Sequence, residues 1–76
     1  MNILGRYDMS ASEAVKKVRV NCYLTVDEFS KEIGISRHTV YNYERGLRKP
    51  KLDTIKKIRE LAKKNGLDIP IEDFLK

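Results

Sequence analysis

Five side chains that can hydrogen-bond to bases or phosphates occur close together in the segment GISRHTVYNYERG, residues 34–46. They are Arg37, His38, Tyr41, Asn42 and Arg45. Arginine forks two hydrogen bonds onto O6 and N7 of guanine, and asparagine pairs with the edge of adenine. Tyrosine and histidine can donate to base or phosphate oxygens, and a tyrosine ring can touch the methyl group of thymine. This chemistry requires the side chains to share one face.

A helix over this segment does place them on one face. At about 100° per residue, with Arg37 at zero, the other four side chains fall between about 40° and 140°. Val40, near 300°, and Tyr43, near 240°, then point to the opposite side. The alternative is an ordinary polar face in contact with solvent. We interpret the face as a reading face whose base-reading candidates are Arg37, His38, Tyr41 and Asn42.

Capping residues predict where the first three helices begin. Two capping boxes and a further N-cap serine are present: Ser10 with Glu13, Thr25 with Glu28, and Ser36. Gly34 is expected to end the second helix, because glycine readily takes the left-handed conformation that closes a helix. We expect the third helix to run to Gly46.

The spacing of apolar residues predicts helices throughout the chain. Buried sides are expected at Val15, Val18, Cys22, Phe29, Ile33, Ile35, Ile55, Ile58, Leu61 and Ala62. A fourth helix should span about residues 52–65. A short C-terminal helix should lie within residues 67–76, with Phe74 and Leu75 sealing the core, and residues 1–9 should form an arm or lead-in. The prediction is an all-α fold, a compact bundle of four to five helices in a single domain over residues 1–76.

The basic residues are concentrated in one part of the chain. The formal net charge is +5, yet residues 34–66 contain ten Lys/Arg against three Asp/Glu, a net +7. The positive electrostatic field of this part of the chain suits a polyanion, and nucleic acid is the commonest polyanion. A basic surface can also serve solubility alone. The candidates for binding phosphate are Ser36, Arg45, Arg48, Lys49 and Lys51.

The run LTVDEFSKEIGISRHTVYNYERGLRKPKLDTIKKI, residues 24–58, resembles the helix-turn-helix domain of the Cro/cI family of phage and bacterial repressors. The resemblance is carried, in register, by Leu24-Thr25, Gly34, Ser36, Val40, Glu44-x-Gly46 and Pro50. It implies a lambda-repressor-like fold with the helix-turn-helix at residues 25–46. It also implies that the second helix lies across the DNA backbone while the third enters the major groove.

The resemblance further implies a buried ion pair between Arg19 on the first helix and Glu44 at the end of the third. The sequence departs from the family pattern at three places. Val26 stands where a phosphate-binding glutamine is often found, and Lys51 stands where a serine often caps the fourth helix. The chain between Pro50 and the last helix is also a few residues longer than usual.

The leading interpretation is a sequence-specific transcriptional regulator that binds double-stranded operator DNA. Any homodimer would form through its last helix. The alternative is a protein-binding modulator, such as an anti-repressor or an antitoxin-type partner, which binds a repressor or another protein. Val26 and Tyr41 would then belong to the protein interface, because an apolar side chain and a tyrosine both suit such a surface.

Other functions are disfavoured by the composition. The chain has one histidine and one cysteine, with no Cys/His cluster at metal-ligand spacing and no glycine-rich phosphate loop. We therefore expect no catalysis, no metal and no cofactor. Cys22 allows no intramolecular disulfide, and the chain shows neither a signal peptide nor an apolar run of membrane-spanning length. A cytoplasmic protein is expected.

Overall fold

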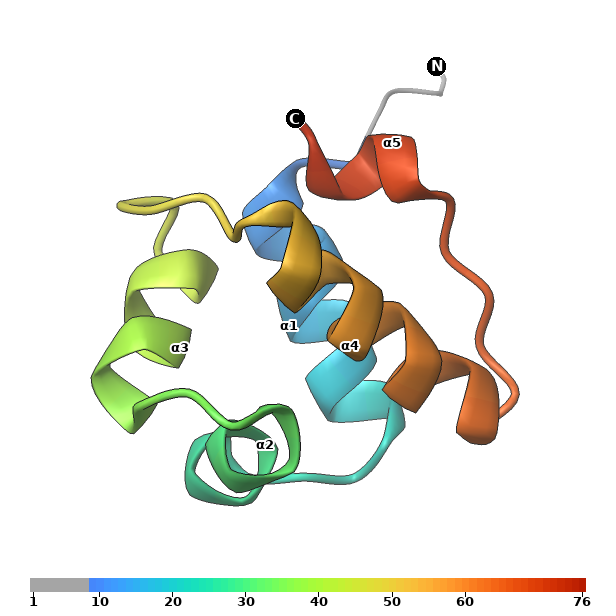
Figure 1. Ribbon diagram of the computed structural model, residues 1–76, viewed down its shortest axis with the longest axis horizontal. Coiled ribbons are helices and arrows are strands. Elements are labelled where there is room, and N and C mark those ends of the chain that lie inside the picture. The colour runs from blue at the N-terminus through green and yellow to red at the C-terminus, as the bar shows by residue number, and fades with distance from the viewer. Residues whose placement is uncertain (1–8) are drawn as a thin grey trace, which may run out of the picture.

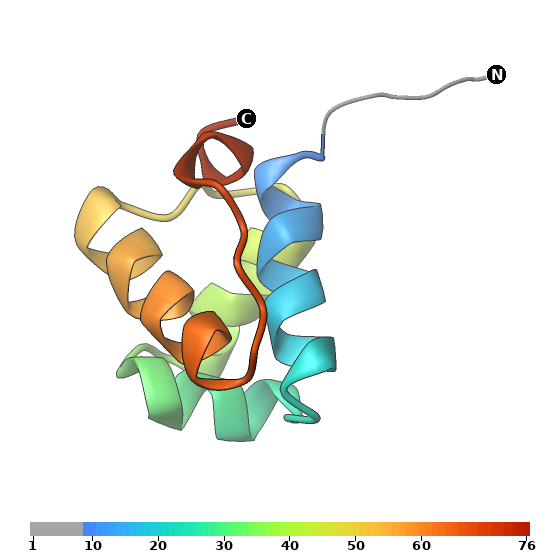
Figure 2. The same ribbon diagram turned by 90° about the vertical axis from the view of Figure 1, so that its right-hand side faces the viewer.

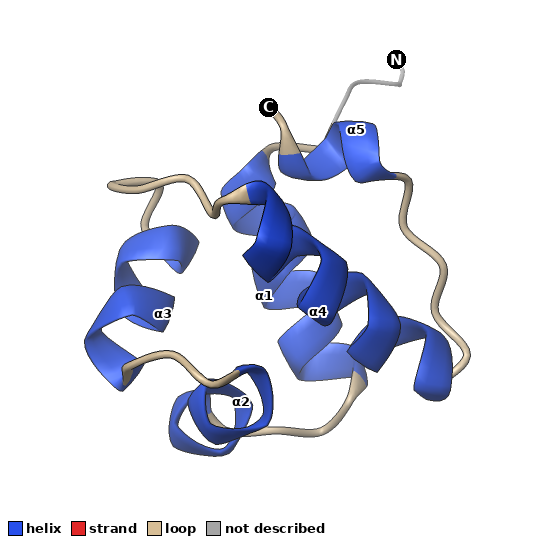
Figure 3. Ribbon diagram, viewed as in Figure 1, coloured by secondary structure: helices blue, strands red, loops and turns tan. Residues whose placement is uncertain are grey.

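The computed structural model describes residues 9–76, which form five helices and no strands (Figures 1 and 3). The helices are α1 (Ala11–Asn21), α2 (Val26–Ile33), α3 (Arg37–Glu44), α4 (Leu52–Lys64) and α5 (Ile71–Phe74). The predicted all-α fold is confirmed. The arm expected over residues 1–9 lies outside the described residues except for Met9, which is half-buried against the core.

Both predicted capping boxes are present. The Ser10 N–H donates to the Glu13 carboxylate at 2.9 Å, and the Thr25 N–H donates to the Glu28 carboxylate at 2.9 Å. In each box the N-cap hydroxyl accepts the backbone N–H of the glutamate in return. Gly34 ends α2 with φ +85°, as expected of a left-handed C-cap. The starts of α1 and α2 therefore depend on contacts between residues three apart in the chain.

The core lies where α1 and α4 face each other and the other helices close around them. α1 packs against α3, α4 and α5, and α2 packs against α3 and α4. Figures 1 and 2 show α2 at one end of this arrangement and α5 at the other. The largest fully buried side chains are Phe29, Phe74, Ile55, Ile58, Val15, Val18 and Val40. Because α3 buries only one side against α1 and α2, its other side remains outside the bundle.

The short C-terminal helix lies within the predicted range but differs from the prediction in one side chain. Its helical residues are Ile71–Phe74, while the chain from Leu67 to Pro70 is not helical. The Arg59 Nε donates to the Ile69 carbonyl at 2.9 Å and so holds this non-helical stretch against α4. Phe74 is buried, but the prediction that Leu75 also seals the core was wrong, because its side chain is 57% exposed. A single helical turn directs Phe74 inward, and the next residue, about 100° further round, points outward.

The third helix ends earlier than expected. Glu44 is its last residue and Arg45 is the C-cap, so the predicted end at Gly46 was two residues too late. The Leu47 N–H then donates to the Asn42 carbonyl at 2.9 Å, while Gly46 adopts φ +76°. This left-handed turn suits glycine and directs the chain away from α3 toward α4.

Candidate nucleic-acid interface

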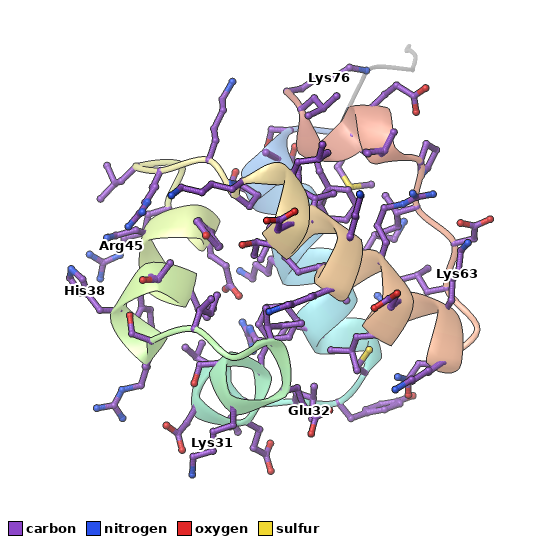
Figure 4. All side chains as sticks on the ribbon, viewed as in Figure 1. Lys31, Glu32, His38, Arg45, Lys63 and Lys76 are labelled. Atoms are coloured by element: carbon purple, nitrogen blue, oxygen red, sulfur yellow. The ribbon has the colours of Figure 1, made fainter. Side chains whose placement is uncertain are left out.

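The base-reading candidates lie on the side of α3 that faces away from the core. Arg37, His38 and Tyr41 are exposed, and Asn42 is half-buried. On the opposite side Val40 and Tyr43 are buried. In Figure 4 the labelled His38 and Arg45 point outward from the body of the molecule. The structure thus brings together the residues that the helical spacing had grouped, while their contacts with bases remain a prediction.

The start of α3 is built around Ser36. Its hydroxyl accepts the backbone N–H of Thr39 at 3.0 Å and lies 2.8 Å from the Thr39 hydroxyl. When the Thr39 hydroxyl is the donor in that second contact, the Ser36 proton stays available to an oxygen outside the helix. Arg37 and His38 follow in the first turn, where backbone N–H groups and the helix dipole favour an anion. This end of α3 therefore has the groups needed to meet a phosphate.

Basic side chains form a rim at the other end of α3 and in the connection to α4. We call Arg45, Arg48, Lys49 and Lys51 the basic rim; all four are exposed. Within residues 9–76 none of them is within ion-pairing distance of a carboxylate. Lys51 is the N-cap of α4, and its side chain makes no capping hydrogen bond. In the described part of the chain, the positive charge of the rim next to the α3 face therefore has no carboxylate partner.

One member of the rim lies over the ring of a residue of the reading face. The Arg45 guanidinium carbon lies 5.8 Å from the centre of the Tyr41 ring, within the range of a cation–π contact. The two residues are four apart, the spacing at which side chains on one helix meet. That spacing was the available signal for this contact in the sequence. Helical geometry alone places both residues on one face, but it does not show that their side chains meet.

Arg19 and Glu44 form an ion pair, as the family resemblance implied. The Arg19 Nε lies 2.7 Å from Glu44 Oε2, and the side chains are 17% and 11% exposed. Arg19 also donates to the Leu24 carbonyl at 3.1 Å. The pKa of Arg19 is raised, chiefly by its hydrogen bond to Glu44. Partial burial acts in the opposite direction and lowers this pKa. The pair joins α1 to the end of α3 and thereby fixes the direction of the reading face.

The apolar residues near the site are arranged differently from the prediction. Val26 is half-buried and packs against the core, so it offers less apolar surface to a partner than its position in the sequence suggested. Leu47, which the sequence analysis did not single out, is 71% exposed in the connection after α3. No periodic signal marks Leu47, because it lies between two helices.

Two further observations concern other kinds of site. Across residues 9–76, no three side chains among His, Cys, Asp and Glu come together in a way that could hold a metal ion. None of the helices in that part of the chain combines the length and the apolar character needed to cross a membrane.

Comparison with known families identifies the class of protein. Residues 15–69 match the helix-turn-helix family HTH_3, and this range contains α2, α3 and α4 in full. The chain belongs to this family, the Cro/cI-type helix-turn-helix domains, and the all-α bundle is consistent with the lambda-repressor-like fold. It is accordingly a DNA-binding regulator in general terms, in a family of typically non-catalytic domains. No curated protein matches the chain.

Proposed function

We propose that this protein is a sequence-specific transcriptional regulator, a Cro-like repressor, that inserts α3 into the major groove of operator DNA. Arg37 and His38 would enter the groove first, since they occupy the first turn, the part of a recognition helix that usually reaches base edges. Tyr41 and Asn42 would face the groove one turn later. α2 would lie across the DNA backbone beside α3.

The observation that carries the proposal is the position of uncompensated charge next to an exposed polar helix face. The basic rim has no ion-pair partner among residues 9–76, and it directly follows the face of α3. A DNA-binding protein needs cations to neutralise phosphates and separate polar groups to read bases. Here the two sets adjoin, so one duplex could meet both.

Selection from a pool of randomised duplexes tests this function directly. A sequence-specific regulator should enrich a short common sequence and bind it far more tightly than the unselected pool, by a factor of about 10³ or more. A reporter gene placed behind the selected sequence should be repressed when the protein is expressed. Enrichment of no common sequence, at an affinity equal to that for the pool, would contradict the proposal.

The exposed apolar groups near α3 favour one second candidate, a protein-binding modulator that grips a repressor or another regulator. Leu47 is 71% exposed and Tyr41 is 43% exposed. Such a protein would leave DNA unbound at physiological salt but change the DNA binding of its partner. Leu47→Ser would then weaken the protein complex. Leu47 suits this test better than Val26, whose half-buried side chain cannot be made charged without disturbing the core.

Two further parts of the proposal concern assembly and place of action. A two-fold dimer would read half-sites about one helical turn apart. The exposed Leu75 beside α5 offers apolar surface for such a contact, and sedimentation equilibrium of the parent and of Leu75→Ser would measure it. As a regulator of prokaryotic or phage DNA, the protein would act in the cytoplasm.

A further inference from the structure

Tyr41 differs from the other residues of the reading face in how it is packed. It is 43% exposed, and the guanidinium carbon of Arg45 lies 5.8 Å from its ring centre. One face of the ring therefore has a cation of the same protein within cation–π range before any DNA is bound.

Arg45 needs such support because of its position. It is the C-cap of α3, is exposed, and has no carboxylate partner among the described residues. A free arginine side chain loses much rotamer freedom when it is held against a phosphate. A cation–π contact with a ring restricts the guanidinium in advance, so less freedom is lost on binding.

We propose that Tyr41 is a positioning residue, whose ring holds the Arg45 guanidinium ready for the DNA backbone and whose hydroxyl contacts no base. This inference rests on the proposed DNA-binding function and narrows it. Base reading is then left to Arg37, His38 and Asn42. The contact at the C-terminal end of α3 becomes a phosphate contact that is the same for every DNA sequence.

A double-mutant cycle on Tyr41 and Arg45 tests the inference, with a short duplex of mixed sequence as the probe. Tyr41→Phe and Tyr41→Trp keep a ring and should bind as the parent does. Tyr41→Leu removes the ring and should weaken binding by about two- to fivefold. In the Arg45→Ala background, Tyr41→Leu should cause no further loss. The salt dependence should flatten in both Arg45→Ala and Tyr41→Leu.

Three results would overturn the inference. Equal losses for Tyr41→Phe and Tyr41→Leu would show that the hydroxyl contacts DNA. An undiminished loss for Tyr41→Leu in the Arg45→Ala background would show that the ring acts independently of Arg45. Failure of the parent itself to bind the duplex would remove the proposed function together with this inference. Melting curves of each variant show whether the fold is kept, and Tyr41→Gln, which also removes the ring, takes the place of Tyr41→Leu in the cycle if Tyr41→Leu fails to fold.

Discussion

Arg19 and Glu44 are joined by two parallel hydrogen bonds, from Nε to Oε2 at 2.7 Å and from Nη2 to Oε1 at 3.0 Å. The third interaction of Arg19, with the Leu24 carbonyl, adds the connection between α1 and α2 to the same cluster. One guanidinium therefore holds together α1, the end of α3 and the turn before α2. A bidentate pair of this kind restricts the relative orientation of its two partners, so it fixes the orientation of α3 relative to the rest of the bundle.

Glu44→Ala should destabilise the protein strongly. The substitution leaves the Arg19 guanidinium in a mostly buried site without its carboxylate, which typically costs about 3 kcal/mol or more. In a domain of this size such a loss lowers the midpoint of thermal unfolding by about 10 °C or more. Differential scanning calorimetry measures the change.

Glu32→Ala is the matched control for Glu44→Ala. Glu32 is an exposed glutamate of α2, labelled in Figure 4, and no described residue is hydrogen-bonded to its side chain. Its removal should alter the midpoint by no more than a surface substitution does, within about 0.5 kcal/mol. Equal effects of the two substitutions would show that the ion pair contributes nothing specific.

Local signals explain why much of the fold could be predicted from the sequence. A capping box such as Ser10 with Glu13 involves residues three apart, so its outcome depends little on the rest of the chain. The grouping of Arg37 with Asn42 on one side, and of Val40 on the other, follows from helical geometry alone. These features appear in the structure where the sequence indicated them.

Features that depend on distant contacts could not be predicted in the same way. The exposure of Leu75 follows from the shortness of α5, and the path of the preceding segment is held by a hydrogen bond from Arg59 to Ile69. Neither residue carries a sequence signal for that contact. Val26 likewise looked like free surface, and only the packing of α2 against its neighbours shows that it is half-buried. Tertiary packing decides such cases.

Arg37→Ala should weaken and broaden DNA recognition. Arg37 is exposed in the first turn of α3, where a base contact is most direct. Its loss should cost about 1–3 kcal/mol at the preferred site and relax the preference at one base pair. Binding titrations against the selected sequence and its single-base variants measure both effects. Unchanged affinity and preference, in a protein whose circular dichroism is unaltered, would remove Arg37 from the reading set.

Glu13 should contribute a pH-dependent share of stability. The pKa of Glu13 lies below its usual 4.5, chiefly because the backbone N–H of Ser10 donates a hydrogen bond to the Glu13 carboxylate. A carboxyl group whose pKa is lower in the folded state stabilises the fold above its unfolded pKa, and this contribution is lost as the pH falls through the folded value. The melting midpoints of the parent and Glu13→Gln should therefore differ at neutral pH and converge in acid. A difference that stays constant with pH would contradict this account.

Lys51→Ala should weaken the binding of all DNA sequences alike, because Lys51 is expected to meet a phosphate and not a base. Each phosphate that a cation neutralises releases condensed counterion, which lowers log affinity by about 0.9 for each unit of log salt. Four contacts from the basic rim would give a slope near −3.6 for each half-site on that rule, and Lys51→Ala should flatten it by about 0.9.

Lys63→Ala provides the comparison for Lys51→Ala, because Lys51 is the N-cap of α4 and Lys63 lies in the last turn of the same helix. Lys63 is also exposed, but Figure 4 shows it on the side of the molecule away from His38 and Arg45. It cannot reach a duplex that is held against α3, so its removal should leave the salt slope unchanged. Titrations of the parent and both variants over a range of salt concentrations on one duplex decide the question. Equal flattening by the two substitutions would mean that the protein attracts DNA through its overall charge, and that the basic rim is no special contact surface.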